Sequence, residues 1–141
     1  MLVVLDSNVL LSSIGKKSPL RKIWLAFRRG LFSIAVNEDI LKEYEEILQE
    51  HAIPGVSEYV MEMFRESPDV YFQHTYYNWN VIEQDPDDNK FFDIAVASSA
   101  HYLVTEDKHF NIVKNLPFPK VNILSADEFI AVLTSIPDGM Q

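Results

Sequence analysis

The chain has 141 residues, which is the size of one domain, and a core of that size needs no disulfide or structural metal. Hydrophobic residues make up 48% of it and charged residues 23%, which is typical of a globular protein and excludes a disordered or fibrous one. Cys is absent, which excludes a disulfide framework, a zinc–thiolate site and a thiol nucleophile, and the net charge of −9 argues against non-specific binding to nucleic-acid phosphates.

The N-terminal stretch gives no sign of a targeting signal. "MLVVLDSNVLLSSIG" has no basic start, and Asp6 interrupts its apolar run. The sequence has no run of about 18 apolar residues that could cross a membrane. We therefore expect a cytoplasmic protein with no membrane partner, folded as a single domain over residues 1–141.

The first half of the chain alternates strand-like and helical patterns. "LVVL" (2–5) predicts a short buried strand, residues 19–29 a helix, and "LFSIAV" (31–36) a second strand. Asn37 can then cap a long amphipathic helix, "EDILKEYEEILQEH", and residues 56–66 predict another helix.

The second half continues this alternation. The aromatic stretch "VYFQHTYYNWNVI" (70–82) contains one strand of unknown register, and residues 87–100 predict a helix. "YLV" (102–104) and "VNIL" (121–124) predict buried strands, and residues 125–134 a last helix capped by Ser125. Strands joined by helices require crossover connections, so the fold class is α/β: a three-layer α/β/α sandwich with a mostly parallel central sheet.

Basic residues are concentrated in one stretch of this acidic chain. Half of the twelve Lys and Arg residues lie in "KKSPLRKIWLAFRR": Lys16, Lys17, Arg21, Lys22, Arg28 and Arg29. They could form the solvated face of a helix whose apolar side packs inward. They could instead form a local patch that faces phosphates.

Acidic residues follow two of the predicted strands. Asp6 comes directly after "LVVL", and Asp107 follows "YLV" with two residues between. In open α/β sheets, ligands bind outside the carboxyl ends of the strands. One such Asp could be an ordinary helix cap, but two at the same edge of a sheet indicate a site.

Helical periodicity selects two further acids, at about 100° per residue. In the helix over 87–100, Asp88 falls in the middle of the inward stripe, whereas Asp87 and Asp93 point away. In the helix after Asn37, Glu43 lies on the flank of the apolar stripe, better placed to face the sheet edge than the other acids of that helix.

Four converging carboxylates need a compensating charge. Two unit charges about 5 Å apart repel by roughly 3 kcal/mol at an effective dielectric near 20. An oxygen-only set of ligands suits a hard ion such as Mg²⁺ or Mn²⁺, which can activate water and stabilise the charge that develops during phosphodiester hydrolysis. Motifs for zinc proteases, serine hydrolases and nucleotide binding are absent, and the four His residues are scattered.

Several of these segments together resemble the PIN-domain family, and most closely the toxin components of bacterial toxin–antitoxin systems. The similarity rests on "VVLDSNVLLSSI", "NEDILKEYEEIL", "DPDDNKFFDIAVASSAHYLVTEDKHF" and "VNILSADEFI", and it spans residues 2 to about 130. It implies an acidic site that holds Mg²⁺ or Mn²⁺ and cleaves RNA, an antitoxin as a protein partner, and dimer formation in many relatives.

Carried over residue by residue, the resemblance selects Asp6, Glu43, Asp88 and Asp107, the same acids that the residue pattern favours. Asp6, Asp88 and Asp107 would bind the metal. The third ligand stays open among Asp87, Asp88 and Asn89, and Asp93 could reach a second ion. Supporting residues implied by the resemblance are Asn8 beside Asp6 and Thr105 beside Asp107.

Two other functions are open to such a chain. The first is a non-catalytic PIN-like module that binds RNA or a protein, although such a module would tend to lose its acids. The second is a phosphotransfer or phosphatase domain. A receiver domain would need an Asp where "LFSIAV" is followed by Asn37, and a haloacid-dehalogenase-like phosphatase would need a second Asp in "DSNVL".

Overall fold

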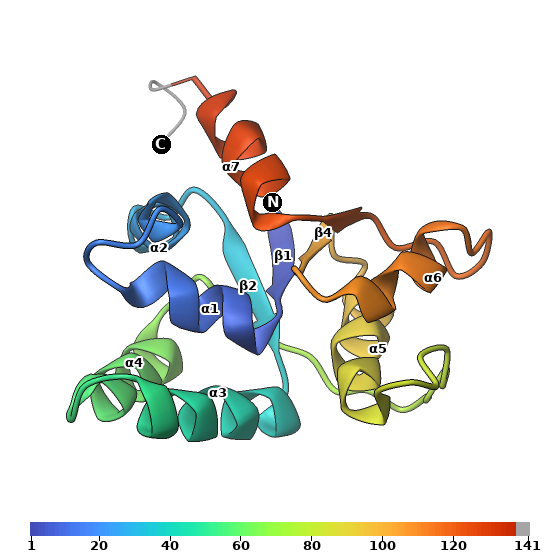
Figure 1. Cartoon of the computed structure of the whole chain (residues 1–141), viewed down its shortest axis with the longest axis horizontal. Helices are drawn as coiled ribbons and strands as arrows, with labels where there is room; N and C mark the ends of the chain where they lie inside the picture. Colours follow the sequence, from blue (N-terminus) through green and yellow to red (C-terminus); the bar gives the residue numbers. More distant parts are fainter. Residues whose placement is uncertain (138–141) are drawn as a thin grey trace.

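Short apolar runs form a central sheet in the computed structural model, which describes residues 1–137. All neighbouring strands are parallel, in the order β3-β2-β1-β4-β5 (Figure 1). The strands are β1 (Leu2–Leu5), β2 (Ser33–Val36), β3 (Val70–Phe72), β4 (Tyr102–Val104) and β5 (Ile123–Leu124). The predicted parallel sheet is thus confirmed, and the aromatic stretch contributes only its first three residues to it.

Helices cover both faces of the sheet. In Figure 1, α1 to α4 lie on one side of β1 and β2, and α5 and α6 lie on the other, as a three-layer α/β/α fold requires. The helices are α1 (Ser7–Ile14), α2 (Arg21–Arg28), α3 (Glu38–His51), α4 (Val56–Glu66), α5 (Asn89–Ala97), α6 (Asn111–Lys114) and α7 (Ala126–Thr134). Two short 3-10 helices, η1 (Pro86–Asp88) and η2 (Lys108–Phe110), precede α5 and α6.

The predicted helix caps are confirmed. Asn37 accepts a hydrogen bond from the backbone N–H of Ile40 at 2.9 Å, and Ser125 forms a reciprocal capping box with Glu128. Because each cap satisfies N–H groups that have no partner inside the helix, it fixes where the helix begins.

The predicted helix over 87–100 is wrong at both ends. Pro86–Asp88 form a 3-10 turn, in which the N–H of Asn89 reaches the carbonyl of Pro86, and the α-helix begins only at Asn89. At the other end, Ser99 has a φ of 54°, a left-handed conformation that terminates a helix. Asp88 therefore lies just before α5.

Helix α1 was not predicted from the sequence.

The core lies between the sheet and the helices. Val3 and Val4 of β1 and Leu103 and Val104 of β4 are completely buried. The apolar face of α2 also packs inward, where Trp24 and Phe27 contact Phe64 of α4. Continuous apolar strands are expected where helices cover both faces of a sheet.

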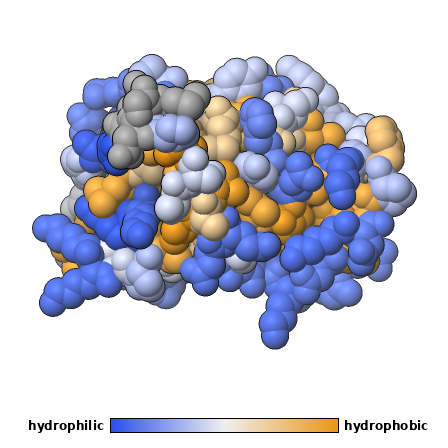
Figure 2. Space-filling model, turned by 90° about the horizontal axis from the view of Figure 1, so that it is seen from above, coloured by the Kyte–Doolittle hydropathy of each residue, from blue (hydrophilic) through white to orange (hydrophobic). Residues whose placement is uncertain are grey.

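Polar side chains cover most of the outside. Figure 2 shows the face seen from above, where charged and polar residues predominate and apolar residues are exposed between them. Within residues 1–137, every helix is too short or too polar to span a bilayer.

The order of the strands places a reversal of winding between β1 and β4. The chain first builds outward from β1 to β2 and β3, and then returns to place β4 and β5 on the opposite side of β1. The direction of winding reverses between β1 and β4, so a crevice is expected outside the carboxyl ends of these two strands. Asp6 and Thr105 directly follow these strands.

Candidate metal-binding site

Asp6 and Thr105 are joined across the ends of β1 and β4. The Thr105 hydroxyl donates to Oδ2 of Asp6 at 2.7 Å and accepts a hydrogen bond from the backbone N–H of Asp107 at 3.0 Å. Both side chains are buried, and the N–H of Asp6 also bonds to the carbonyl of Val104 at 3.0 Å. One hydroxyl group thus fixes the distance between two of the predicted acids.

Asn8 contacts Asp6 through its backbone. Its backbone N–H donates to Oδ1 of Asp6 at 3.3 Å, while the residue is exposed. This bond is the N-terminal cap of α1 and depends on the backbone of residue 8. Ser7, between these two residues, is buried, and its hydroxyl donates to Glu43.

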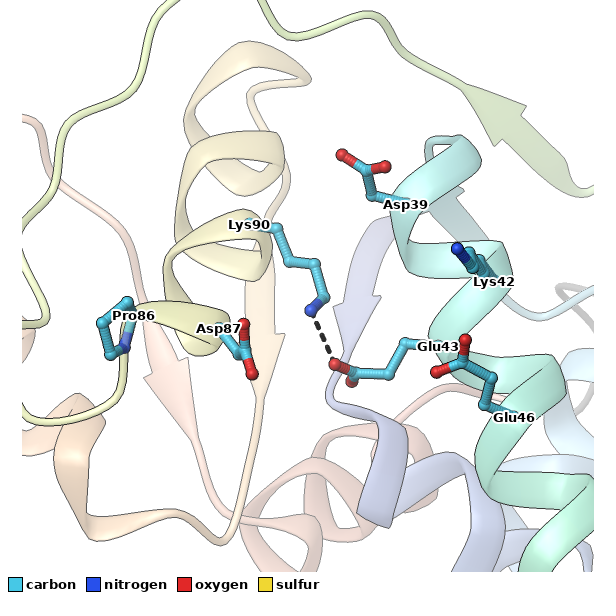
Figure 3. Close-up of a pocket in the computed structure, with 7 residues that line it drawn as sticks. All are labelled: Asp39, Lys42, Glu43, Glu46, Pro86, Asp87 and Lys90. Carbon is cyan, nitrogen blue, oxygen red and sulfur yellow. Dashed lines mark ion pairs between the residues drawn. The ribbon is translucent and has the colours of Figure 1, made fainter.

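Glu43 is held from two directions. Besides the bond from Ser7, its Oε1 lies 2.6 Å from Nζ of Lys90 on α5 (Figure 3). This ion pair crosses a cleft of about 420 Å³ between α3 and the start of α5, lined by Asp39, Lys42, Glu43, Glu46, Pro86, Asp87 and Lys90. Below it, Tyr44 is fully buried and its hydroxyl donates to the carbonyl of Leu5 at 2.5 Å, which holds α3 against the end of β1.

Within residues 1–137, four residues form a group that could hold a metal ion, and Asp6 and Glu43 are not among them. One oxygen each of Asp85, Asp88 and Asp107 and one nitrogen of His109 lie within 4.8 Å of one another. Nδ1 of His109 is 3.2 Å from Asp107, 3.6 Å from Asp88 and 3.9 Å from Asp85. Sequence reasoning missed Asp85 and His109, because Asp85 lies in a loop and His109 in the short 3-10 helix η2, where no periodicity shows which residues meet.

Asp88 is the most perturbed acid of this group. Burial, followed by the neighbouring carboxyl of Asp107 and the charges of Asp85 and Asp6, raises the pKa of Asp88 to about 8. Its Oδ2 is buried without a hydrogen-bond partner among residues 1–137. Burial also raises the pKa of Asp6, with the charges of Glu43 and Asp107 adding to the effect and the bond from Thr105 opposing it.

This arrangement fits a hard divalent cation. A buried carboxylate oxygen without a partner is costly, and carboxylates whose pKa values are raised by one another's charges favour either a proton or a metal ion. Mg²⁺ and Mn²⁺ both take carboxylate oxygens, and Mn²⁺ also accepts an imidazole nitrogen. The donors present at the ends of β1 and β4 therefore match such an ion.

The other candidates for the third ligand lie elsewhere. Asp87 is exposed and belongs to the cleft of Figure 3. The side chain of Asn89 is buried and bonds both the N–H of Ile82, at 2.9 Å, and its carbonyl, at 3.0 Å. Among Asp87, Asp88 and Asn89, only Asp88 joins the acidic group.

Asp93 corrects the prediction from helical angles. It was expected to point outward, but it is buried and accepts a hydrogen bond from the backbone N–H of Trp79 at 3.1 Å. Burial raises the pKa of Asp93, and the bond from Trp79 lowers it. The prediction failed because the segment 73–82 covers that side of α5, which no helical pattern could show.

The basic stretch lies apart from these acids. Lys16, Lys17, Arg21 and Arg28 line a separate groove of about 940 Å³ beside α1, α2 and α4, which shares no residue with the cleft at Glu43. Arg21 donates to the carbonyl of Ile14, and Arg28 donates to the hydroxyl of Tyr59 at 2.8 Å.

Comparison with known proteins agrees with this fold. The structure is similar to VapBC2 from Rickettsia felis, solved bound to a DNA fragment from its promoter, with a TM-score of 0.62, 18% identity and coverage of 89% of this chain and 98% of that chain. It is also similar to VapC20 of Mycobacterium tuberculosis, a toxin that cleaves the sarcin–ricin loop, with a TM-score of 0.57, 11% identity and coverage of 79% and 95%. No curated protein matches the sequence. The model of the PIN domain matches residues 2–109, and the chain therefore belongs to the PIN-domain family.

Proposed function

We propose that this protein is a ribonuclease that uses Mg²⁺ or Mn²⁺ to hydrolyse phosphodiester bonds in RNA. The observation that carries the proposal is the buried, unpartnered oxygen of Asp88 beside Asp107, at the point where the winding of the sheet reverses. Asp6, Asp88 and Asp107 would hold the ion, directly or through water. When bound, such an ion supplies an activated water and neutralises charge on the phosphate.

The remaining residues of the site would position the metal ligands, the attacking water and the RNA. Glu43 completes the ligand set or orients and polarises the attacking water, and its bonds to Ser7 and Lys90 fix it for either role. Thr105 fixes the positions of Asp6 and Asp107 relative to each other. His109 lies beside three carboxylates and can hydrogen-bond with a group that enters the site. The basic stretch from Lys16 to Arg29, which lies apart from the acids, would guide the RNA backbone.

We further propose that the protein is the toxin of a toxin–antitoxin pair acting in the cytoplasm. The likeness to VapBC2 and to VapC20 supports this assignment. A protein antitoxin would then be its partner, with a homodimer as the other assembly to test. Expression of the chain alone in a bacterial host should arrest growth, and the Asp88→Asn variant should not.

The ribonuclease proposal is tested by cleavage of a pool of structured and single-stranded RNA with Mg²⁺, Mn²⁺ or EDTA. We expect cleavage that needs the ion and falls by at least about a hundredfold in Asp6→Asn and Asp88→Asn. Asp87→Asn is the matched control, since it removes an exposed acid next to Asp88. Equal loss in all three variants, or cleavage that persists in EDTA, would contradict the proposal.

A further inference from the structure

A second surface with its own chemical character flanks the acidic site. It is formed by two segments, 73–82 and 108–120, which we call the aromatic flank. Tyr77 and Trp79 lie edge to face with ring centroids 4.7 Å apart, and Trp79 meets Phe118 with centroids 5.8 Å apart. Phe118 is 75% exposed and Tyr77 64% exposed, so these rings present free faces or edges to solvent.

The charge of the aromatic flank contrasts with that of the whole chain. Segment 73–82 contains no acid, and segment 108–120 contains Lys108, Lys114 and Lys120 and no acid, in a protein whose net charge is −9. All three lysines are exposed. Exposed aromatic rings interleaved with cations, without acids among them, match the chemistry that binds unpaired nucleotides.

Both segments are tied to the acidic site. Segment 73–82 leads directly toward Asp85, and segment 108–120 contains His109 near its start, so each connects to a member of the acidic group. The first segment is also anchored on α5, through Trp79 to Asp93 and Ile82 to Asn89. Asp93 and Asn89 lie on the helix that directly follows Asp88, so the flank is anchored on the same element that positions this acid.

We propose that the aromatic flank binds unpaired nucleotides of the RNA, by stacking bases on Phe118, Trp79 and Tyr77 while the lysines contact the backbone. This inference rests on the proposed ribonuclease function and adds to it a surface, outside the acidic group, that holds the RNA. Stacking on an aromatic ring is tolerant of base identity, so the flank selects unpaired over paired RNA and not one sequence over another.

Fluorescence gives a direct test, because the chain has two Trp residues and only Trp79 is accessible, whereas Trp24 is 4% exposed. Short oligouridylate, oligoadenylate and a blunt RNA duplex are titrated into the protein in EDTA, where no ion supports cleavage. We expect the two single strands to quench the emission and the duplex not to do so. The quenching should vanish in Trp79→Phe, which keeps a ring but removes the reporter.

The Phe118→Ala variant measures the contribution of stacking. It should weaken binding of single strands by about 5- to 150-fold, the range expected for one stacked base. Tyr71→Ala is the matched control, because Tyr71 is 50% exposed on β3 and belongs to neither segment. Size-exclusion chromatography of both variants tests the other use of such a surface, contact with a second copy of the chain.

The outcomes separate this inference from the ribonuclease proposal. Quenching by single strands without cleavage under any ion would support the flank and overturn the ribonuclease. Cleavage with no quenching, or with Phe118→Ala binding single strands as tightly as the unmodified protein, would overturn the flank alone. A change of oligomeric state in Phe118→Ala with unchanged RNA binding would also overturn it.

Discussion

The hydroxyl of Thr105 contacts two acids of the proposed site at once. It donates to Asp6 and accepts from the N–H of Asp107. Thr105→Val removes both bonds with almost no change of shape, and we expect metal affinity and cleavage to fall by about 10- to 100-fold, as for other groups that orient metal ligands. Calorimetric titration with Mn²⁺ and the cleavage assay would measure the two effects.

Thr105→Ser is the matched control for this substitution, since it keeps the hydroxyl and loses only a methyl group. It should retain most of the metal affinity. If Ser and Val at position 105 were equally impaired, packing of the methyl group and not hydrogen bonding would hold the acids, and the positioning role would be wrong.

Single residues divide clearly into those that the sequence could place and those that it could not. Asp6 and Asp107 were predictable because they follow strands, and parallel strands end at one edge. Asp85, His109 and Lys90 were not, because their positions depend on how loops and helices meet in space. Asp88 was correctly expected to face inward, although it lies in a 3-10 turn and not in the regular helix from which that expectation came.

At the scale of elements, Asn89 determines how the segment 73–82 lies against α5. Its side chain satisfies the buried N–H and carbonyl of Ile82 in a segment that has few backbone hydrogen bonds of its own. Asn89→Ala should lower the free energy of unfolding by about 2–4 kcal/mol, since it leaves two backbone groups without partners. Urea denaturation would measure this change.

The exposed Gln84, two residues after this segment, offers a control, and Gln84→Ala should change the free energy of unfolding by less than about 0.5 kcal/mol. A similarly small effect for Asn89→Ala would mean that water replaces the lost bonds. In that case Asn89 would not be the residue that fixes the segment.

Elements with a strong local signal were predicted almost to the residue, and others were not. Helix α4 occupies the predicted residues, and α3 and α7 begin after the predicted caps. Helix α1 was not predicted because its eight residues, "SNVLLSSI", are four apolar and four small polar residues without a clear amphipathic period. The strand within 70–82 covers only three residues, since the rest of that segment packs on α5 and not along β2.

At the scale of the whole molecule, the acidic site should make stability depend on pH. The pKa of Asp88 is raised to about 8, and burial also raises those of Asp6 and Asp93, whereas an unfolded Asp titrates near about 4. Below about pH 4 these carboxyl groups are protonated in both the folded and the unfolded protein. Between about pH 4 and 8 the unfolded chain releases their protons first, so the free energy of unfolding falls as pH rises.

We therefore expect the melting temperature in EDTA to be lower at pH 8 than at pH 5, and the decline to be shallower in Asp88→Asn, which has no proton to lose. Mg²⁺ should raise the melting temperature more at pH 8 than at pH 5, because it binds the ionised carboxylates of the folded state only. Asp87→Asn, an exposed neighbour, should keep the full decline. An unchanged slope in Asp88→Asn would show that Asp88 ionises freely in the folded protein. The raised pKa of Asp88 would then no longer support the proposed cation site at this edge of the sheet.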